Sequence, residues 1–223
     1  VLPVIKVEAP SGYGLDNRFM YALNKFENFK RPCGGGNIEA CENVKRVILD
    51  WAKADAAKRT GPSNHEGRHW NDTLTVNLWV ASPMMAGYSF AKQIIKVPDN
   101  EDKLIKDWFE RIVKKNKHLM YGMTYKQGTQ AIGVPKRAHN HALSSAIAHM
   151  ELGILLNDNT QFRKAFKKYE AALKHQRGDG SLPIETRRGG RAMFYQGRAM
   201  NALAVIAIIA ENQGYNICEY EYR

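Results

Sequence analysis

The chain has 223 residues, of which 44% are hydrophobic and 10% aromatic, a composition that suits one sizeable globular domain with a hydrophobic core. No apolar run reaches membrane-spanning length, so we expect a soluble chain with no membrane insertion. The net charge of +11 attracts polyanions. Nucleic acid, an anionic membrane and an acidic polysaccharide all fit, and the sign of the charge does not choose among them.

The first half of the chain reads as an irregular segment followed by helices. Residues 1–37 carry Pro and Gly punctuation at "APSGYG" and "RPCGGG". Helical apolar spacing begins at residue 38 and continues to about 59. A second apolar helix is predicted over roughly 70–96, with a kink or break at Pro83. A third, over 98–119, begins acidic and ends basic, as the helix dipole favours.

The second half continues the helical pattern after a long loop over 121–137. One helix begins near Asn140, an amphipathic helix follows over 160–176, and the last long helix runs from about 188 to 213. No segment reads as a strand and no second domain is apparent. The sequence therefore predicts an all-α fold of successive helical hairpins in one domain over 1–223.

Two of the three cysteines are placed so that they can meet. Cys33 and Cys41 flank the flexible stretch "GGGNIEA", and a disulfide between them would suit a secreted or periplasmic protein. Three reduced thiols are the alternative. Cys218 would be left over in the first case.

Two stretches carry residues that can do chemistry: "KRAHNHALSS" and "GDGSLPIETRRGGRAMFYQGRA". If the last helix starts near Arg188, then Arg188, Arg191, Tyr195 and Arg198 share one of its faces. Taken singly, the arginines read as a solvated face and the tyrosine as a packing residue. His139 and the histidine two residues later read as helix-cap or surface residues.

Taken together, these residue types suit the cleavage of an acidic sugar polymer by β-elimination. The proton on C5, beside the carboxylate, is removed and the C4–O bond breaks. Donors such as Asn, Arg and His must neutralise the carboxylate and stabilise the anion that develops. His or Tyr can supply the base for C5 and the acid for O4. This chemistry requires no metal and no organic cofactor.

The chain resembles the alginate lyases that act on poly-mannuronate, which have an incomplete α/α toroid. The resemblance rests on "WAKADA", on "HNHALSSAIAHMELGILLNDNTQF" with its Asn-His pair, and on "DGSLPIETRRGGRAMFYQGRAMNAL" with Leu-Pro, Glu, Arg and a Tyr seven residues later. It covers roughly residues 38–217. The separations of 47 residues from His141 to Arg188 and 54 to Tyr195 also resemble those of the family.

The resemblance implies a role for each matching residue. Asn140 and Arg188 would neutralise the uronate carboxylate. His141 would share that role, or act as base when the C5 proton faces the other way. Tyr195 would protonate O4 and, on mannuronate, would also remove the C5 proton. Nearby arginines, Arg191 among them, would favour the phenolate that this requires. Backbone N–H groups at the helix start would also favour an anion.

The chain departs from the family pattern in several places. Ala142 follows the Asn-His pair where the family often has Ser-Tyr-Trp, and Gln196 follows the tyrosine where it often has His-Asn. These changes predict a different sugar-binding cleft. The toroid is expected to be shorter than usual, with residues 1–37 as a lid. The residues expected to bind substrate are Arg191, Arg198, Arg68, Trp70, Tyr125, Arg137 and Tyr13.

The function that the resemblance implies is that of a secreted or periplasmic polysaccharide lyase acting on a polyuronate, foremost poly-mannuronate. Glucuronate has the same arrangement at C4 and C5, so a glucuronan or mixed-uronate lyase is an alternative. A catalytically silent polyuronate-binding protein is another. No recognised nucleic-acid motif accompanies the charge, so no nucleic-acid partner is expected. The sequence leaves the oligomeric state open.

Overall fold

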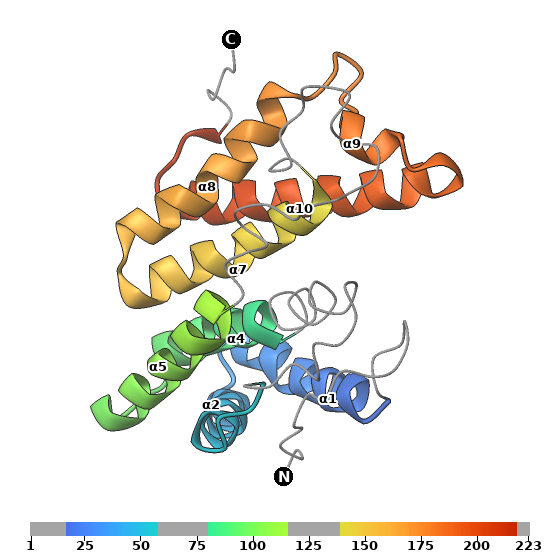
Figure 1. Cartoon of the computed structure of the whole chain (residues 1–223). Helices are drawn as coiled ribbons and strands as arrows, with labels where there is room; N and C mark the ends of the chain where they lie inside the picture. The colour runs from blue at the N-terminus through green and yellow to red at the C-terminus, as the bar shows by residue number, and fades with distance from the viewer. Residues whose placement is uncertain (1–16, 58–79, 116–138, 218–223) are drawn as a thin grey trace. The chain divides into compact units, whose positions relative to one another are not determined.

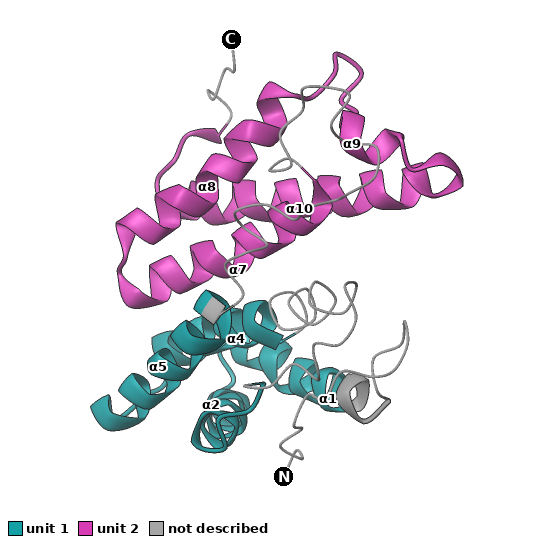
Figure 2. Ribbon diagram, in the orientation of Figure 1, with its two compact units in different colours: residues 1–115 teal, residues 116–223 magenta. Residues whose placement is uncertain are grey.

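The computed structural model describes residues 17–57, 80–115 and 139–217, and every regular element within these ranges is a helix (Figure 1). The predicted all-α class is therefore confirmed for the described residues. The chain divides into two compact units, Val1–Lys115 and Asn116–Arg223 (Figure 2). The single domain expected over 1–223 stays a prediction.

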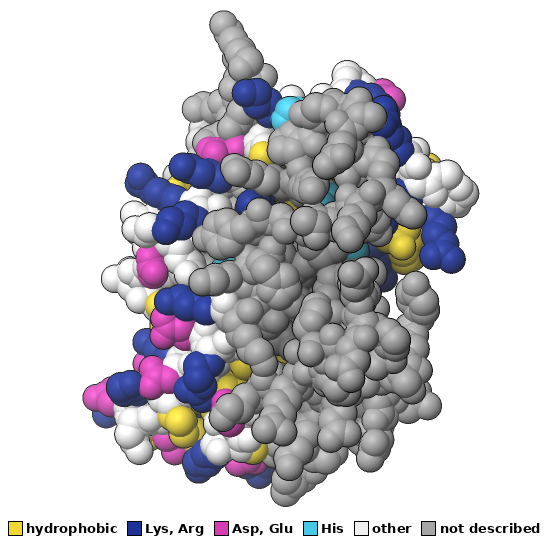
Figure 3. All heavy atoms as spheres, in the orientation of Figure 1, with side chains coloured by type: hydrophobic (Ala, Val, Ile, Leu, Met, Phe, Trp, Pro, Cys, Tyr) yellow, Lys and Arg dark blue, Asp and Glu magenta, His cyan; other side chains and the backbone are white. Residues whose placement is uncertain are grey.

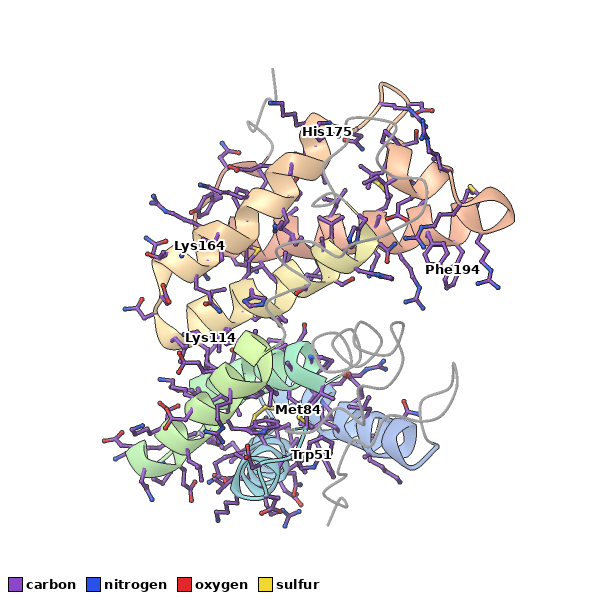
Figure 4. The ribbon with its side chains drawn as sticks, in the orientation of Figure 1. Trp51, Met84, Lys114, Lys164, His175 and Phe194 are labelled. Atoms are coloured by element: carbon purple, nitrogen blue, oxygen red, sulfur yellow. A yellow bond between two sulfur atoms is a disulfide. The ribbon has the colours of Figure 1, made fainter. Side chains whose placement is uncertain are left out.

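The described part of unit 1 consists of α1 (Asn17–Gly34), α2 (Ile38–Lys53), α4 (Ser82–Ile94) and α5 (Asp99–Lys115). Helix α2 packs against the other three, and α1 also contacts α4. Apolar side chains at helical spacing form the interior, and Figure 4 labels two of them, Trp51 and Met84, which are about 1% exposed. Burial of such large side chains is the main favourable term in folding.

Helix α1 corrects the expectation that residues 1–37 are irregular. The helix runs from Asn17 to Gly34, and Ala22, Leu23 and Phe26 are buried along one side of it. Pro32 lies in its last turn, where little helix remains to be disrupted. The Pro and Gly residues at "RPCGGG" therefore mark the end of a helix and not an irregular segment.

Helix α4 covers the later part of the helix predicted over 70–96, whose residues 70–79 lie outside the described part of the chain. It starts at Ser82 and carries Pro83 in its first turn, where the fixed proline φ suits a helix and the missing N–H is not needed. Residues 80 and 81 form a π-helical turn directly before it, so the regular α-helix breaks next to Pro83, as the sequence predicts. The Tyr88 hydroxyl of α4 donates to Asp102 of α5 at 2.7 Å, which joins the two helices.

Of the two alternatives that the sequence leaves open for Cys33 and Cys41, the structure has the disulfide. It links the end of α1 to the start of α2, and both cysteines are fully buried. The bond closes a loop with a sequence separation of 8, which by loop-closure entropy stabilises the folded chain by about 2.5 kcal/mol.

Removal of this disulfide is expected to lower the free energy of unfolding by about that amount. The measurement is denaturant unfolding of the oxidised protein with and without dithiothreitol, after equilibration long enough to reduce a buried bond. The double variant Cys33→Ala, Cys41→Ala is the control, because reductant should not shift its midpoint. An oxidised protein whose midpoint also ignores reductant would contradict the prediction.

The described part of unit 2 consists of α7 (Asn140–Leu156), α8 (Asn159–Lys174), the short α9 (Pro183–Thr186), a 3₁₀ turn (Gly189–Arg191) and α10 (Ala192–Asn212). Helix α7 packs against both α8 and α10 and is buried at every residue from 140 to 150. The shared core contains Leu143, Ala146, Ile147, Met150, Phe162, Ala165, Phe166, Tyr169, Ala172, Leu182, Ala199, Ala202, Leu203, Ile206 and Ala210.

The turn between α7 and α8 brings two backbones into close contact. Asn157 takes the left-handed conformation at φ 55°, and the Asp158 side chain caps α8 by accepting from the Gln161 N–H at 2.9 Å. A Cβ added to Gly153 would lie 2.9 Å from the Phe162 backbone nitrogen. Glycine at this position therefore lets α8 approach α7 closely, and this holds the antiparallel pair that carries the site.

One described segment meets the length and composition of a membrane span, although no apolar run of that length was expected. An 18-residue window of this segment, Gly189–Asn212, has a mean hydropathy of 1.3, and 22% of that window is buried. The core helix of a soluble protein can meet the same criteria. Within unit 2 the segment packs one face, which includes Leu203 and Ile206, against α7 and α8.

Candidate active site

Three consecutive polar residues stand at the start of α7, and all three are buried: His139, Asn140 and His141. His139 is the N-cap, and its Nδ1 accepts a hydrogen bond from the Ala142 N–H at 3.1 Å. The cap interpretation of His139 is therefore confirmed. Because Nδ1 accepts, the neutral imidazole of His139 carries its proton on Nε2.

A carboxylate from far along the chain binds this helix start. Glu185, in α9, is 0% exposed. Its Oε1 accepts from the Asn140 backbone N–H at 2.6 Å, and both of its oxygens lie 2.9 Å from Asn140 Nδ2. An ionised carboxylate only accepts hydrogen bonds, so the Asn140 amide turns its nitrogen towards Glu185 and its oxygen away. The anion expected at this helix start is therefore present, and it is the protein's own Glu185 carboxylate.

Arg188 connects the carboxylate to the candidate catalytic phenol. Its Nε lies 3.0 Å from Glu185 Oε2, and its side chain is 19% exposed. Its guanidinium carbon lies 3.9 Å from the centroid of the Tyr195 ring, which is a close cation–π contact. Continuous contacts therefore run from Asn140 through Glu185 and Arg188 to Tyr195, and the structure brings together three of the four predicted catalytic residues.

His141, the fourth predicted catalytic residue, is under the influence of the same charges. Burial, together with the positive charges of Arg188 and Arg198, lowers its pKa to about 4. Burial likewise is the main cause that lowers the pKa of His139 to about 3, and the two rings meet edge to face with centroids 5.5 Å apart. Both imidazoles are therefore neutral at neutral pH.

These two histidines predict a loss of stability in mild acid. In the unfolded chain a histidine takes up a proton below about pH 6.5, whereas the pKa values of His139 and His141 in the folded chain are about 3 and about 4. The unfolded state therefore binds more protons in this window, and the free energy of unfolding should fall as the pH drops below the unfolded value. The measurement is denaturant unfolding at about pH 7.5, 5.5 and 4.5, on either side of that value.

The matched comparison is the double variant His139→Asn, His141→Gln. The change His139→Asn keeps a helix cap, since an asparagine side-chain oxygen also accepts at an N-cap. Between the highest and the lowest pH the variant should lose less stability than the parent. Equal losses in both proteins would show that other groups cause the acid sensitivity.

The predicted arginine–tyrosine face of the last helix is wrong in its geometry. Helix α10 starts at Ala192, so Arg188 and Arg191 precede it. Gly189 takes a φ of 57°, a left-handed conformation that suits glycine and interrupts the helix. The turn still folds Arg188 back against Tyr195. Arg191 is exposed, and its role in binding substrate stays a prediction.

Gln196, which stands where the family often has histidine, contacts the backbone of the preceding turn. Its Oε1 accepts from the Leu182 N–H at 3.0 Å, and its Nε2 donates to the Gly180 carbonyl at 3.5 Å. These bonds hold the turn before α9 against α10. Gln196 therefore supports the segment that carries Glu185, and neither residue is among the site residues predicted from the sequence.

Five predicted substrate-binding residues lie outside the described part of the chain: Arg68, Trp70, Tyr125, Arg137 and Tyr13. Among the described residues no group of three or more His, Cys, Asp and Glu side chains is placed to hold a metal. On the face drawn in Figure 3, Lys and Arg side chains are spread widely, with Asp and Glu among them. The site is therefore located by its contacts and not by the surplus of charge.

The structure superposes on alginate lyase A1-III from Sphingomonas species A1 with a TM-score of 0.71 at 18% identity, covering 99% of this chain and 60% of that one. A histidine-to-alanine variant of A1-III complexed with tetrasaccharide gives a TM-score of 0.72 at 18% identity, covering 97% and 61%. The fold therefore defines an α/α toroid protein, shorter than these solved chains, as the sequence predicted.

Residues 8–223 match the alginate lyase family, and the chain belongs to that family. It is 25% identical over 186 residues to an alginate lyase of Pseudomonas syringae pv. syringae, covering 82% of this chain and 45% of the relative. It is 26% identical over 186 residues to an alginate lyase of Cobetia marina, with the same two coverages. The chain thus spans less than half the length of these curated relatives.

Proposed function

We propose that the protein is a polysaccharide lyase that cleaves a polyuronate, foremost poly-mannuronate, by β-elimination. The observation that carries the proposal is the continuous series of contacts from Asn140 through Glu185 and Arg188 to Tyr195. This series of contacts holds two donors suited to a carboxylate, Asn140 and Arg188, beside the phenol of Tyr195. Membership of the alginate lyase family supports the substrate class.

Arg188 and Asn140 would neutralise the uronate carboxylate. Glu185 binds Arg188 through Nε, which holds the guanidinium in place beside the Tyr195 ring. The side-chain amide of Asn140 donates to both oxygens of Glu185, which fixes its orientation at the start of α7. Buried donors fixed in advance stabilise a developing anion more than mobile ones do. Glu185 fixes both.

Tyr195 would perform the proton transfers on mannuronate. Its phenolate oxygen takes the C5 proton, the C4–O bond breaks, and a C4=C5 double bond forms. The same phenol then gives the proton to the leaving O4 and returns to its starting form. The guanidinium carbon of Arg188 lies 3.9 Å from the centroid of this ring. His141, neutral at neutral pH, donates to the carboxylate or accepts the C5 proton of the opposite epimer.

Glucuronan is the second candidate substrate, because glucuronate and mannuronate share their arrangement at C4 and C5. The disulfide between Cys33 and Cys41 supports a secreted or periplasmic location, where such bonds persist. The groups named above suffice for the elimination without a metal or an organic cofactor.

Ultraviolet absorbance during incubation with poly-mannuronate, poly-guluronate and glucuronan tests the proposal. The new double bond is conjugated to the carboxylate and absorbs. We expect the largest rise with poly-mannuronate. A rise with glucuronan alone would mean that the proposed reaction is right and that the substrate is glucuronan instead of poly-mannuronate. No rise with any of the three, in the presence of measurable polymer binding, would overturn the lyase in favour of a silent binding protein.

A further inference from the structure

The first turns of α10 carry an aromatic ring and a cation that the proposed mechanism does not use. Phe194 is 57% exposed. The guanidinium carbon of Arg198, four residues later, lies 4.7 Å from its ring centroid. Residues four apart lie on one face of a helix, so the two side chains form a single surface feature. Figure 4 shows Phe194 projecting away from the α10 ribbon near its start.

This pair is continuous with the candidate active site. The Phe194 ring meets the Tyr195 ring edge to face, with centroids 5.3 Å apart. Tyr195 in turn lies against Arg188. The charge of Arg198 reaches His141 and contributes to lowering its pKa. Arg188 therefore contacts the Tyr195 ring, and Arg198 contacts the neighbouring Phe194 ring.

Packing of α10 does not explain the position of Phe194. The helix buries its small and aliphatic side, with Ala199, Leu203 and Ile206 in the core of unit 2. Ile208, on the same helix, is also 57% exposed, so exposure alone marks no function. What distinguishes Phe194 is its position between the tyrosine and a stacked arginine.

We propose that Phe194 and Arg198 form a subsite for the uronate residue next to the one that is cleaved. Arg198 binds the carboxylate of that neighbouring sugar, and the exposed part of the Phe194 ring packs against its C–H face. A polyuronate carries one carboxylate on every sugar, so a second cation beside the first matches the repeat of the polymer. The guanidinium fork suits a carboxylate, and stacking on Phe194 keeps it oriented.

This inference rests on the proposed function, and its test uses the length of the substrate. Both kcat and KM are measured on mannuronate oligomers of increasing length. In the parent, kcat/KM should rise once an oligomer is long enough to fill the subsite. Arg198→Ala should raise KM for the long oligomers by about tenfold, the effect of losing one charge-assisted contact. Phe194→Ala should raise it too, because the ring packs against the sugar and keeps the guanidinium oriented. The gain in kcat/KM with length should disappear.

Two variants sharpen the result. Ile208→Ala removes an equally exposed side chain from the same helix and should keep the length dependence. Arg198→Lys keeps the charge and loses the fork, so its KM for the long oligomers should fall between those of the parent and of Arg198→Ala.

An active parent whose length dependence is unchanged in Phe194→Ala would overturn the subsite and leave the lyase proposal intact. A parent that cleaves no uronate polymer would overturn the lyase proposal itself. Calorimetric titration with a mannuronate oligomer would then decide whether Phe194→Ala weakens binding, which supports the subsite, or leaves it unchanged, which overturns it.

Discussion

Tyr195→Phe is expected to lower the turnover of poly-mannuronate by at least about 10³-fold, because one phenol both removes the C5 proton and protonates O4. The substitution deletes the hydroxyl and keeps the ring, so the contact with Arg188 at 3.9 Å should persist. Binding of the polymer should therefore change little. The measurements are the initial rate of absorbance increase and the dissociation constant for a mannuronate oligomer.

Tyr215→Phe is the matched control. This tyrosine lies near the end of the described chain and packs its ring against Phe162 and Phe166. The same atom is removed there from the same residue type, away from Arg188, and turnover should be kept. Retention of most of the activity in Tyr195→Phe would remove the phenol from the mechanism and assign the base and acid to another group, with His141 the first to examine.

Glu185→Ala is expected to lower the free energy of unfolding by about 3–5 kcal/mol, because it breaks a buried ion pair by removing one partner. Glu185 is fully buried and accepts from Asn140 and Arg188 together. Removal of the carboxylate takes the buried counter-charge from the guanidinium and the acceptor from a helix-start N–H. Glu211→Ala is the control, because Glu211 is exposed on α10 and its loss should change stability little.

The double variant Glu185→Ala, Arg188→Ala separates the buried charge from the lost packing. If the guanidinium without its carboxylate causes most of the loss, the double variant should be less destabilised than the sum of the two single variants. Glu185→Gln keeps the shape, but its amide nitrogen must face a donor, so an intermediate loss is expected. Additive effects of Glu185 and Arg188 would mean that the ion pair is not coupled.

Periodicity and capping predicted much of the fold. Helices α5, α7 and α8 lie within a few residues of their predicted bounds, because their apolar spacing and terminal residues agree with each other. Helix α1 was missed because "RPCGGG" was taken as irregular when Pro32 and the glycines only end a helix. Helix α9 has four residues, too short to show a period.

The site was predicted less completely than the fold. The resemblance named Asn140, Arg188 and Tyr195, and the structure brings them into one series of contacts. Glu185 was part of the quoted motif but had no assigned role, since the spacing of three residues to Arg188 does not reveal a partner 45 residues earlier. That pairing is a tertiary contact and becomes visible only when α9 is placed against the start of α7.

The hydrogen bond from the Asn140 backbone N–H to Glu185 also makes the opening of the site measurable by hydrogen exchange. An amide proton exchanges with solvent only when its hydrogen bond opens, and here the acceptor is the fully buried Glu185 carboxylate of a distant segment. Opening it requires α9 to leave α7, and no local fraying of the helix end is enough. The Asn140 amide should therefore exchange with deuterium as slowly as the core amides of α7, so that its exchange rate reports how often the assembled site comes apart.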